Sequence, residues 1–334
     1  RLYAIDGVFA TLTVVLFNVL FLLVFQLGIV GYVLATVCSD LLSAFFLFVI
    51  ARLWKYIRLR RGILAVSLDM LRYSMPLIPT TISWWLTNVS SRYIIAEILG
   101  SAVNGQYTAA NKIPTIVTII SGIFIDAWQL SAVTDGTGRD QAAFFTRVFV
   151  AFQSIAFLCG SGLILGDRLA MTLLTAKEYS DAWRYVPVLV MSTCFASMDQ
   201  FLGSVYMVEK RSSMALVTQM LGAVINVGLC IVLLPIPEIG AIGAALACLI
   251  SYMAVFVMRA VSARRLIGMR FGLPRLAMNV FILGTQSVIL ILELPLWVLW
   301  EILLTALAAC VNLRPVLHQV QQLLARRIAR RQAE

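Results

Sequence analysis

The sequence has little charge, one histidine and no paired cysteine spacing. Charged residues make up 13% of the 334 positions, against roughly 25% in soluble domains. The one histidine, His318, lies in the tail, so we expect neither a histidine-based zinc site nor a Ser-His-Asp arrangement. The cysteines lie in apolar segments, so we expect small buried hydrophobes, with no disulfide framework, metal site or cofactor. They are Cys38, Cys159, Cys194, Cys230, Cys248 and Cys310.

Long apolar runs dominate instead. Hydrophobic residues make up 61% of the chain and its mean hydropathy is +0.94, which indicates an integral membrane protein. A membrane helix needs about 20 apolar residues, and continuous rather than alternating runs favour helices over a barrel. The runs are 7–27, 29–51, 74–99, 104–133, 143–165, 185–207, 214–234, 240–260, 276–292 and 296–312. We predict an all-α polytopic membrane helix bundle with about ten transmembrane helices.

The positive charge is unevenly distributed. If the basic loop 52–61 is cytoplasmic and the spans alternate, Arg168, Lys177 and Arg184 fall outside, and Arg92 and Lys112 fall within the membrane. The other Lys and Arg residues then lie on the cytoplasmic side, including the carboxy terminus, as the positive-inside rule requires. The net charge of +10 therefore indicates topology and contact with membrane lipids, not a nucleic-acid partner.

Two segments resemble each other. Residues 28–52 and 240–264 share Gly, Gly, Leu, Ala, Ser and Arg at matching positions, although small-residue bias in membrane helices is an alternative explanation. Both copies end in a basic loop, which favours a parallel repeat and a two-lobed bundle. The second copy follows four spans that the first lacks, so we expect an incomplete first lobe in a protein of about fourteen helices.

The repeat suggests domain boundaries. We expect residues 1–65 to end an amino-terminal lobe, 66–265 to form a six-helix lobe, and 266–312 to add two helices. In the remaining segment, 313–334, the residues from Val316 onward suit a basic amphipathic helix on the cytoplasmic membrane surface, or a solvated helix end.

Two cations interrupt apolar spans. Arg92 and Lys112 flank a turn around residues 101–104, each about ten residues from its centre, or roughly 15 Å of helical rise. Because a charge at the bilayer centre costs at least about 2.5–3.5 kcal/mol, it normally faces a cavity or a partner. A pair at one depth suggests an anion site. Alternatively, Glu97, Asp126 or carbonyl oxygens neutralise them.

A polar stripe accompanies the cations. Thr81, Trp85, Asn88 and Arg92 recur at helical spacing in one span. Asn111 lies beside Lys112 in the next span. Such a face suits a wet cavity better than lipid. Trp85 can stack on a sugar ring, although packing is an alternative role.

Proline residues divide these spans. We expect Pro114 to kink the helix that carries Lys112, and Pro76 and Pro79 to break or bend the start of the span that carries Arg92.

Three aspartates lie within predicted spans. Asp40, Asp126 and Asp199 are candidates for ion coupling, because protonatable carboxylates inside a bundle often serve that purpose. The alternative is that they pair with Lys112, Arg72 or backbone donors.

The segment around the two cations resembles a known family. LRYSMPLIPTTISWWLTNVSSRYIIAEILGSAVNGQYTAANKIPTI, followed by AWQLSA, is similar to the seventh and eighth helices of bacterial polysaccharide-biosynthesis flippases. These are O-antigen-type transporters of the multidrug/oligosaccharidyl-lipid/polysaccharide exporter superfamily. The resemblance extends to about residue 265.

The resemblance implies a function. Two lobes would enclose a cationic cavity containing Arg92 and Lys112, and an undecaprenyl-pyrophosphate-linked sugar would cross the bacterial inner membrane by alternating access. Trp85, Asn88 and Asn111 would contact sugar, and a polysaccharide polymerase and chain-length regulator would be partners.

Other function classes remain open. A drug or cation antiporter would share the fold but should have an acidic cavity. A polymerase or ligase would need larger external loops than these, and a structural role stays possible.

Overall fold

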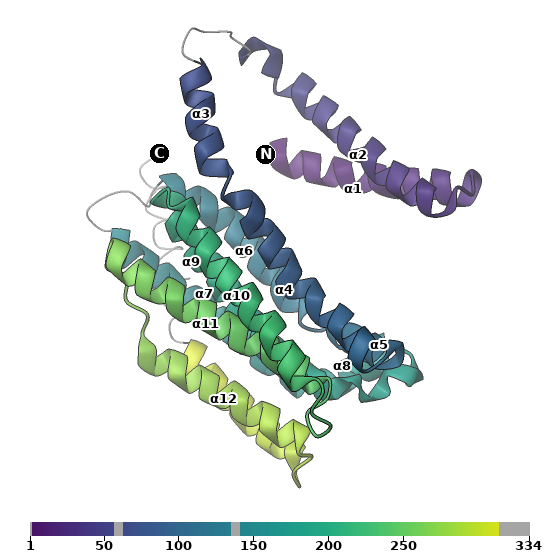
Figure 1. Cartoon of the computed structure of the whole chain (residues 1–334), viewed down its shortest axis with the longest axis vertical. Helices are drawn as coiled ribbons and strands as arrows, with labels where there is room; N and C mark the ends of the chain where they lie inside the picture. The colour runs from purple at the N-terminus through teal and green to yellow at the C-terminus, as the bar shows by residue number, and fades with distance from the viewer. Residues whose placement is uncertain (1, 57–62, 135–140, 314–334) are drawn as a thin grey trace, which may run out of the picture. The chain divides into compact units, whose positions relative to one another are not determined.

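The structure is a computed structural model that describes residues 2–56, 63–134 and 141–313. Its elements in those ranges are helical, with no strand. They form two compact units, Arg1–Met70 and Leu71–Glu334 (Figure 1). The amphipathic helix expected from Val316 onward lies outside the described residues.

The elements follow one another along the chain with short connections. They are α1 (Leu2–Asn18), η1 (Val19–Val24), α2 (Gly28–Ile50), η2 (Leu53–Tyr56), α3 (Ile63–Ser74), α4 (Leu77–Ile98), α5 (Ser101–Ala110), α6 (Thr115–Thr134), α7 (Gln141–Leu165), α8 (Asp167–Leu174), η3 (Lys177–Tyr185), α9 (Val186–Val208), α10 (Ser212–Leu233), α11 (Ile242–Ile267), α12 (Leu273–Ile291) and a last helix, Trp297–Leu313.

The first unit is built on a helical hairpin of α1 and α2. Polar side chains meet between the two helices, where the hydroxyls of Thr13 and Ser39 are 2.7 Å apart. The rings of Phe9 and Phe46 stack at 4.5 Å beside them. Most large apolar side chains of this hairpin are exposed, as expected for helices whose solvent is lipid.

In the second unit, α9 is the central helix. It contacts α6, α7, α10, α11 and α12, and almost all its side chains are buried. Helix α4 packs against α10, α11 and α5, and Figure 1 shows it at the edge of the unit opposite α12. The core is rich in aromatic rings. Trp128 stacks on Phe201 at 4.8 Å and donates its indole N–H to Ser204 over 2.8 Å.

The carboxy-terminal helices are attached through Arg168. Its guanidinium lies 4.0 Å from the Trp183 ring centre and 4.4 Å from that of Trp297. It also forms an ion pair with Glu293 at 3.3 Å. Since Trp297 begins the last helix, this cation joins that helix to α8 and η3.

The expected count of about ten membrane helices is confirmed. Among the described residues, 8 helices are long and apolar enough to cross a membrane, and Trp297–Leu313 is a shorter apolar helix. Helix α4 has 22 residues and is long enough, but its polar side chains keep it outside that set.

Pro114 and Pro76 lie at breaks between helices as predicted, whereas Pro79 lies in the first turn of α4, which continues through it. The chain leaves α-helical geometry between α5 and α6 at residues 111–114, next to Pro114. It turns at Met75 and Pro76 before α4 begins.

The glycines of the suspected repeat have matching geometry. Gly28 and Gly240 both have positive φ, 57° and 51°. A Cβ added at Gly31 or Gly243, three residues further on, would lie 3.0 Å from Leu27 Cβ or 2.9 Å from Leu233 Cβ. Each pair of glycines therefore lets α2 or α11 begin close to the segment before it, which supports the repeat.

Candidate functional site

Helix α4 is polar on two faces. Thr87, Ser90 and Ser91 are buried on the side that packs against α10 and α11. On the other side Trp85 is 54% exposed, and Arg92 is exposed with it. The predicted stripe therefore lies on the exposed face, and the flanking hydroxyls lie in the protein interior.

The buried face forms a polar seam that the stripe alone did not reveal. Ser90 and Ser91 donate to Asn226 Oδ1 of α10 at 3.3 and 3.4 Å. The Asn226 amide in turn donates to Cys248 Sγ of α11 at 3.2 Å. We call Ser90, Ser91, Asn226 and Cys248 the α4 seam. Its bonds satisfy polar groups that lipid cannot, so they fix α4 against the unit.

Asn88 lies between the two faces. Its Nδ2 donates to the Trp84 carbonyl oxygen at 2.8 Å. Its Oδ1 accepts a bond of 3.3 Å from the Tyr252 hydroxyl of α11. The amide is thus oriented by its own helix and by Tyr252, and one N–H stays available for a ligand.

The two cations have no counter-ion within the part of the chain that the structure describes. Both are exposed, and the ion pair found there joins Arg168 to Glu293 instead. The alternative of neutralisation by Glu97 or Asp126 is therefore not seen, since both acids are themselves exposed and unpaired in the described ranges.

Lys112 lies at a polar groove of about 400 Å³ along α5. Ser101, Asn104 and Thr108 form the α5 side, and the opposite side comes from the segment between α8 and η3, including Tyr179. The Asn104 Oδ1 atom is buried without a hydrogen-bond partner among the described residues.

Asn111 follows the last turn of α5. It donates from Nδ2 to the Tyr107 carbonyl oxygen at 2.8 Å, while its own carbonyl accepts from Thr115 at 2.9 Å. Its side chain therefore caps the end of α5.

The three aspartates differ in environment. Asp40 and Asp126 are exposed. Asp199, on α9, is only 3% exposed, and neither carboxylate oxygen has a hydrogen-bond partner in the described ranges. The buried Arg259 of α11 donates to the main-chain carbonyl oxygen of Asp199 at 2.7 Å. Asp199 is therefore the buried one of the three aspartates, and Asp40 and Asp126 are exposed.

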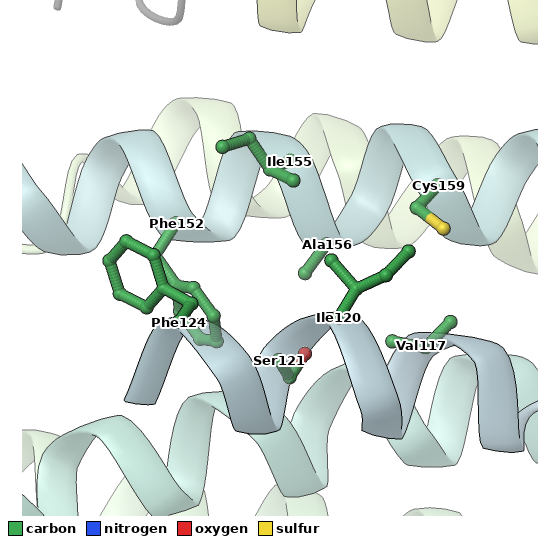
Figure 2. A pocket seen from close by; sticks show the side chains of 8 residues that line it. All are labelled: Val117, Ile120, Ser121, Phe124, Phe152, Ile155, Ala156 and Cys159. Carbon is green, nitrogen blue, oxygen red and sulfur yellow. The ribbon is translucent and has the colours of Figure 1, made fainter. Parts of the chain in front are cut away.

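A second pocket lies between α6 and α7. Its volume is about 100 Å³, and Figure 2 shows its lining side chains converging from the two helices. Phe124, Phe152, Ile120 and Ile155 make it almost wholly apolar. None of the predicted site residues lines it, and its size and chemistry do not suit a saccharide. The described residues contain no group of three or more His, Cys, Asp and Glu side chains able to hold a metal ion.

Comparisons with known proteins agree with this architecture. Residues 3–129 match the family model described as polysaccharide biosynthesis protein. This range contains α4, both cations and the polar stripe. The resemblance read from the residues is confirmed. The match over residues 3–129 concerns polysaccharide biosynthesis, as does the resemblance of the segment around the two cations.

The fold match is to a solved structure titled "Lipid II flippase MurJ, inward closed conformation". The TM-score is 0.60 at 15% identity, and the match covers 96% of this chain and 68% of that one. The chain thus has a MurJ-like, all-helical membrane fold. No curated protein sequence matches it.

Proposed function

We propose that this protein moves a polyprenyl-pyrophosphate-linked oligosaccharide across the bacterial inner membrane for surface polysaccharide synthesis. Its main support is the exposed face of α4, a helix long enough to span a membrane that presents Arg92 and Trp85. Among the described residues Arg92 has no ion pair. An intramembrane cation without a partner is costly against lipid, which favours a water-filled path for an anionic ligand.

The residues of the proposed site suit that substrate class. Arg92 and Lys112 would attract pyrophosphate or acidic sugars, since charge-assisted hydrogen bonds are the strong ones in a partly dry site. Trp85 offers a ring face for a sugar, and Asn88 and Asn111 offer amide groups. Translocation makes and breaks no covalent bond, so the proposal needs no catalytic residue.

The comparisons favour a lipid-linked substrate over a drug. The family match concerns polysaccharide biosynthesis, and the fold match is titled a lipid II flippase. A cation-coupled antiporter, the second candidate, should line its path with acids rather than with Arg92 and Lys112. Alternating access, an O-antigen-type substrate, a cytoplasmic carboxy terminus and partnership with a polymerase and a chain-length regulator belong to the same proposal.

Asp199 is the preferred candidate for coupling transport to an ion gradient. It is buried at the junction of α9 with α11, whereas Asp40 and Asp126 are exposed. Its carboxylate oxygens lack hydrogen-bond donors among the described residues, which leaves them able to take a proton or a cation. Asp199→Asn should abolish the dependence of transport on pH or Na⁺, and an unchanged dependence would remove Asp199 from coupling.

The test of function is export in cells that lack their own O-antigen flippase. Expression of this protein should restore surface polysaccharide, and the double change Arg92→Ala/Lys112→Ala should abolish it at equal protein level in the membrane. Arg270→Ala is the matched control, because Arg270 is equally exposed but follows α11.

The outcomes discriminate between the candidates. Export that persists in the double variant would contradict the site. Absence of export by every variant, together with efflux of cationic drugs in the same cells, would favour the antiporter.

A further inference from the structure

A groove lies between the start of α10 and the end of α11, away from the turn that connects these two helices. It contains none of the residues of the proposed translocation site. Its volume is about 550 Å³, within the range of roughly 300–1,000 Å³ typical of ligand pockets. The walls are apolar and come from two helices, with Met214 and Val217 on α10 and Met258 and Val261 on α11. Both helices are of membrane-spanning length, and the groove lies at the surface of the second unit, since Val217 is 55% exposed and Val261 is 47% exposed.

The open end of the groove is polar and cationic. Arg265 lines it together with Ser213 and Ser262. Further exposed cations, Arg211 and Arg264, lie at the same end of these helices. The acid of the adjoining turn, Glu209, accepts a hydrogen bond from Gln141 at 3.2 Å and forms no ion pair with Arg265 in the described ranges. The groove therefore combines apolar walls with a positive mouth.

A buried polar atom also lacks a partner there. Tyr206 lines the groove and is 2% exposed, and its hydroxyl has no hydrogen-bond partner among the described residues. An unpaired buried hydroxyl is unfavourable, since burying it without a bond loses its hydration. A ligand oxygen at the inner part of the groove would supply the missing acceptor.

We propose that this groove binds an anionic phospholipid of the cytoplasmic leaflet. The phosphate would lie against Arg265 and the two serine hydroxyls, an ester oxygen would accept from Tyr206, and one acyl chain would lie along the methionine and valine walls. Charge complementarity supports this occupant: the basic end of the bundle is the cytoplasmic one by the positive-inside rule, and anionic lipids concentrate in that leaflet.

The test is lipid retention by the full chain in mild detergent. Native mass spectrometry would compare phosphatidylglycerol with phosphatidylcholine of the same acyl chains. We expect preferential retention of phosphatidylglycerol and about tenfold weaker binding in Arg265→Gln, from loss of a hydrogen bond to a charged group. The control Arg264→Gln changes the adjacent exposed arginine, which does not line the groove, and should change affinity less than about twofold.

Two further variants test the groove itself. Val217→Trp places a large ring in it at a position 55% exposed, where folding should tolerate the change, and it should displace both lipids. Tyr206→Phe removes the unpaired hydroxyl, so it should weaken phosphatidylglycerol binding without lowering the melting temperature.

Clear results would overturn the proposal. They are equal retention of the two lipids, equal losses in Arg264→Gln and Arg265→Gln, or preferential occupation by polyprenyl phosphate in competition. The export assay with Arg92 and Lys112 is separate, so failure of either proposal leaves the other intact.

Discussion

Replacing Arg259 by methionine should strongly destabilise the second unit. Arg259 is 6% exposed, and its guanidinium bridges three helices. It donates to Thr218 Oγ1 at 3.2 Å and to Gln219 Oε1 at 3.1 Å on α10, and to the carbonyl oxygen of Asp199 on α9. Methionine keeps an unbranched side chain of similar length but removes the charge and every donor.

The size of the effect can be bounded from these contacts. Hydrogen bonds within membrane proteins average about 0.6 kcal/mol, so three bonds give a lower bound near 2 kcal/mol. Removing one partner of a buried charged network costs about 3–5 kcal/mol, because the remaining groups lose their compensation. Asp199 is such a group, because Arg259 donates to its main-chain carbonyl and its buried carboxylate oxygens have no hydrogen-bond donor among the described residues. We therefore expect a loss of about 2–5 kcal/mol.

Reversible unfolding in mixed detergent micelles would measure this loss. Arg264→Met is the control, since Arg264 is exposed on the same helix. Equal stabilities of the two variants would refute the reasoning. A double-mutant cycle with Asp199→Asn adds a second criterion: if the charges compensate each other, the Asn change should be less costly in the Arg259→Met background by about 0.5–3 kcal/mol.

Two other perturbations have matched controls. Gly222→Ala should lower the free energy of unfolding by about 1–3 kcal/mol, because the new Cβ would lie 2.5 Å from Val255 Cγ2. The control is Gly228→Ala, whose new Cβ would have no atom within 4 Å, and it should be neutral in the same unfolding assay. Burial raises the pKa of Asp167 to about 7 from 3.8, with the charge of Arg168 opposing it. The folded state therefore binds the proton more tightly than the unfolded state. The free energy of unfolding should decrease as the pH rises from about 4 to about 7. In Asp167→Asn the melting temperature should change less with pH over this range than in the parent protein. An equal decline in the parent and the variant would contradict the prediction.

Much of the fold follows from the sequence because membrane helices obey local rules. Continuous apolar runs indicated the number of spans, and the break next to Pro114 needed only the missing N–H of proline. The glycine pairs at Gly28 and Gly240 were recognisable by their spacing. Both have positive φ, a conformation that glycine adopts without a steric penalty.

The packing of α4 was not predictable in the same way. Spacing identified a stripe containing Arg92, but it gave no means of knowing that Ser90 and Ser91 would be buried. Their partners, Asn226 and Cys248, lie on helices far along the chain.

The aspartates show the same limit. Asp126 and Asp199 lie at similar distances from the ends of their predicted spans, so local sequence ranks them equally. Their burial depends on neighbours: α9 is surrounded by five helices, whereas Asp126 lies on an exposed face of α6. Only tertiary packing distinguishes a carboxylate enclosed by protein from one open to its surroundings.

The two polar faces of α4 have separable consequences. Hydrogen bonds of the α4 seam fix the helix to α10 and α11, so alanine at Asn226 should act on stability first. The exposed face contributes little to packing, since Trp85 and Arg92 are both exposed, so changes there should act on ligand passage at unchanged stability. A helix polar on both sides is expensive to place in a membrane. The seam offsets part of that cost by pairing its polar groups, which lets α4 present Arg92 on its other side, a cation without an ion pair among the described residues.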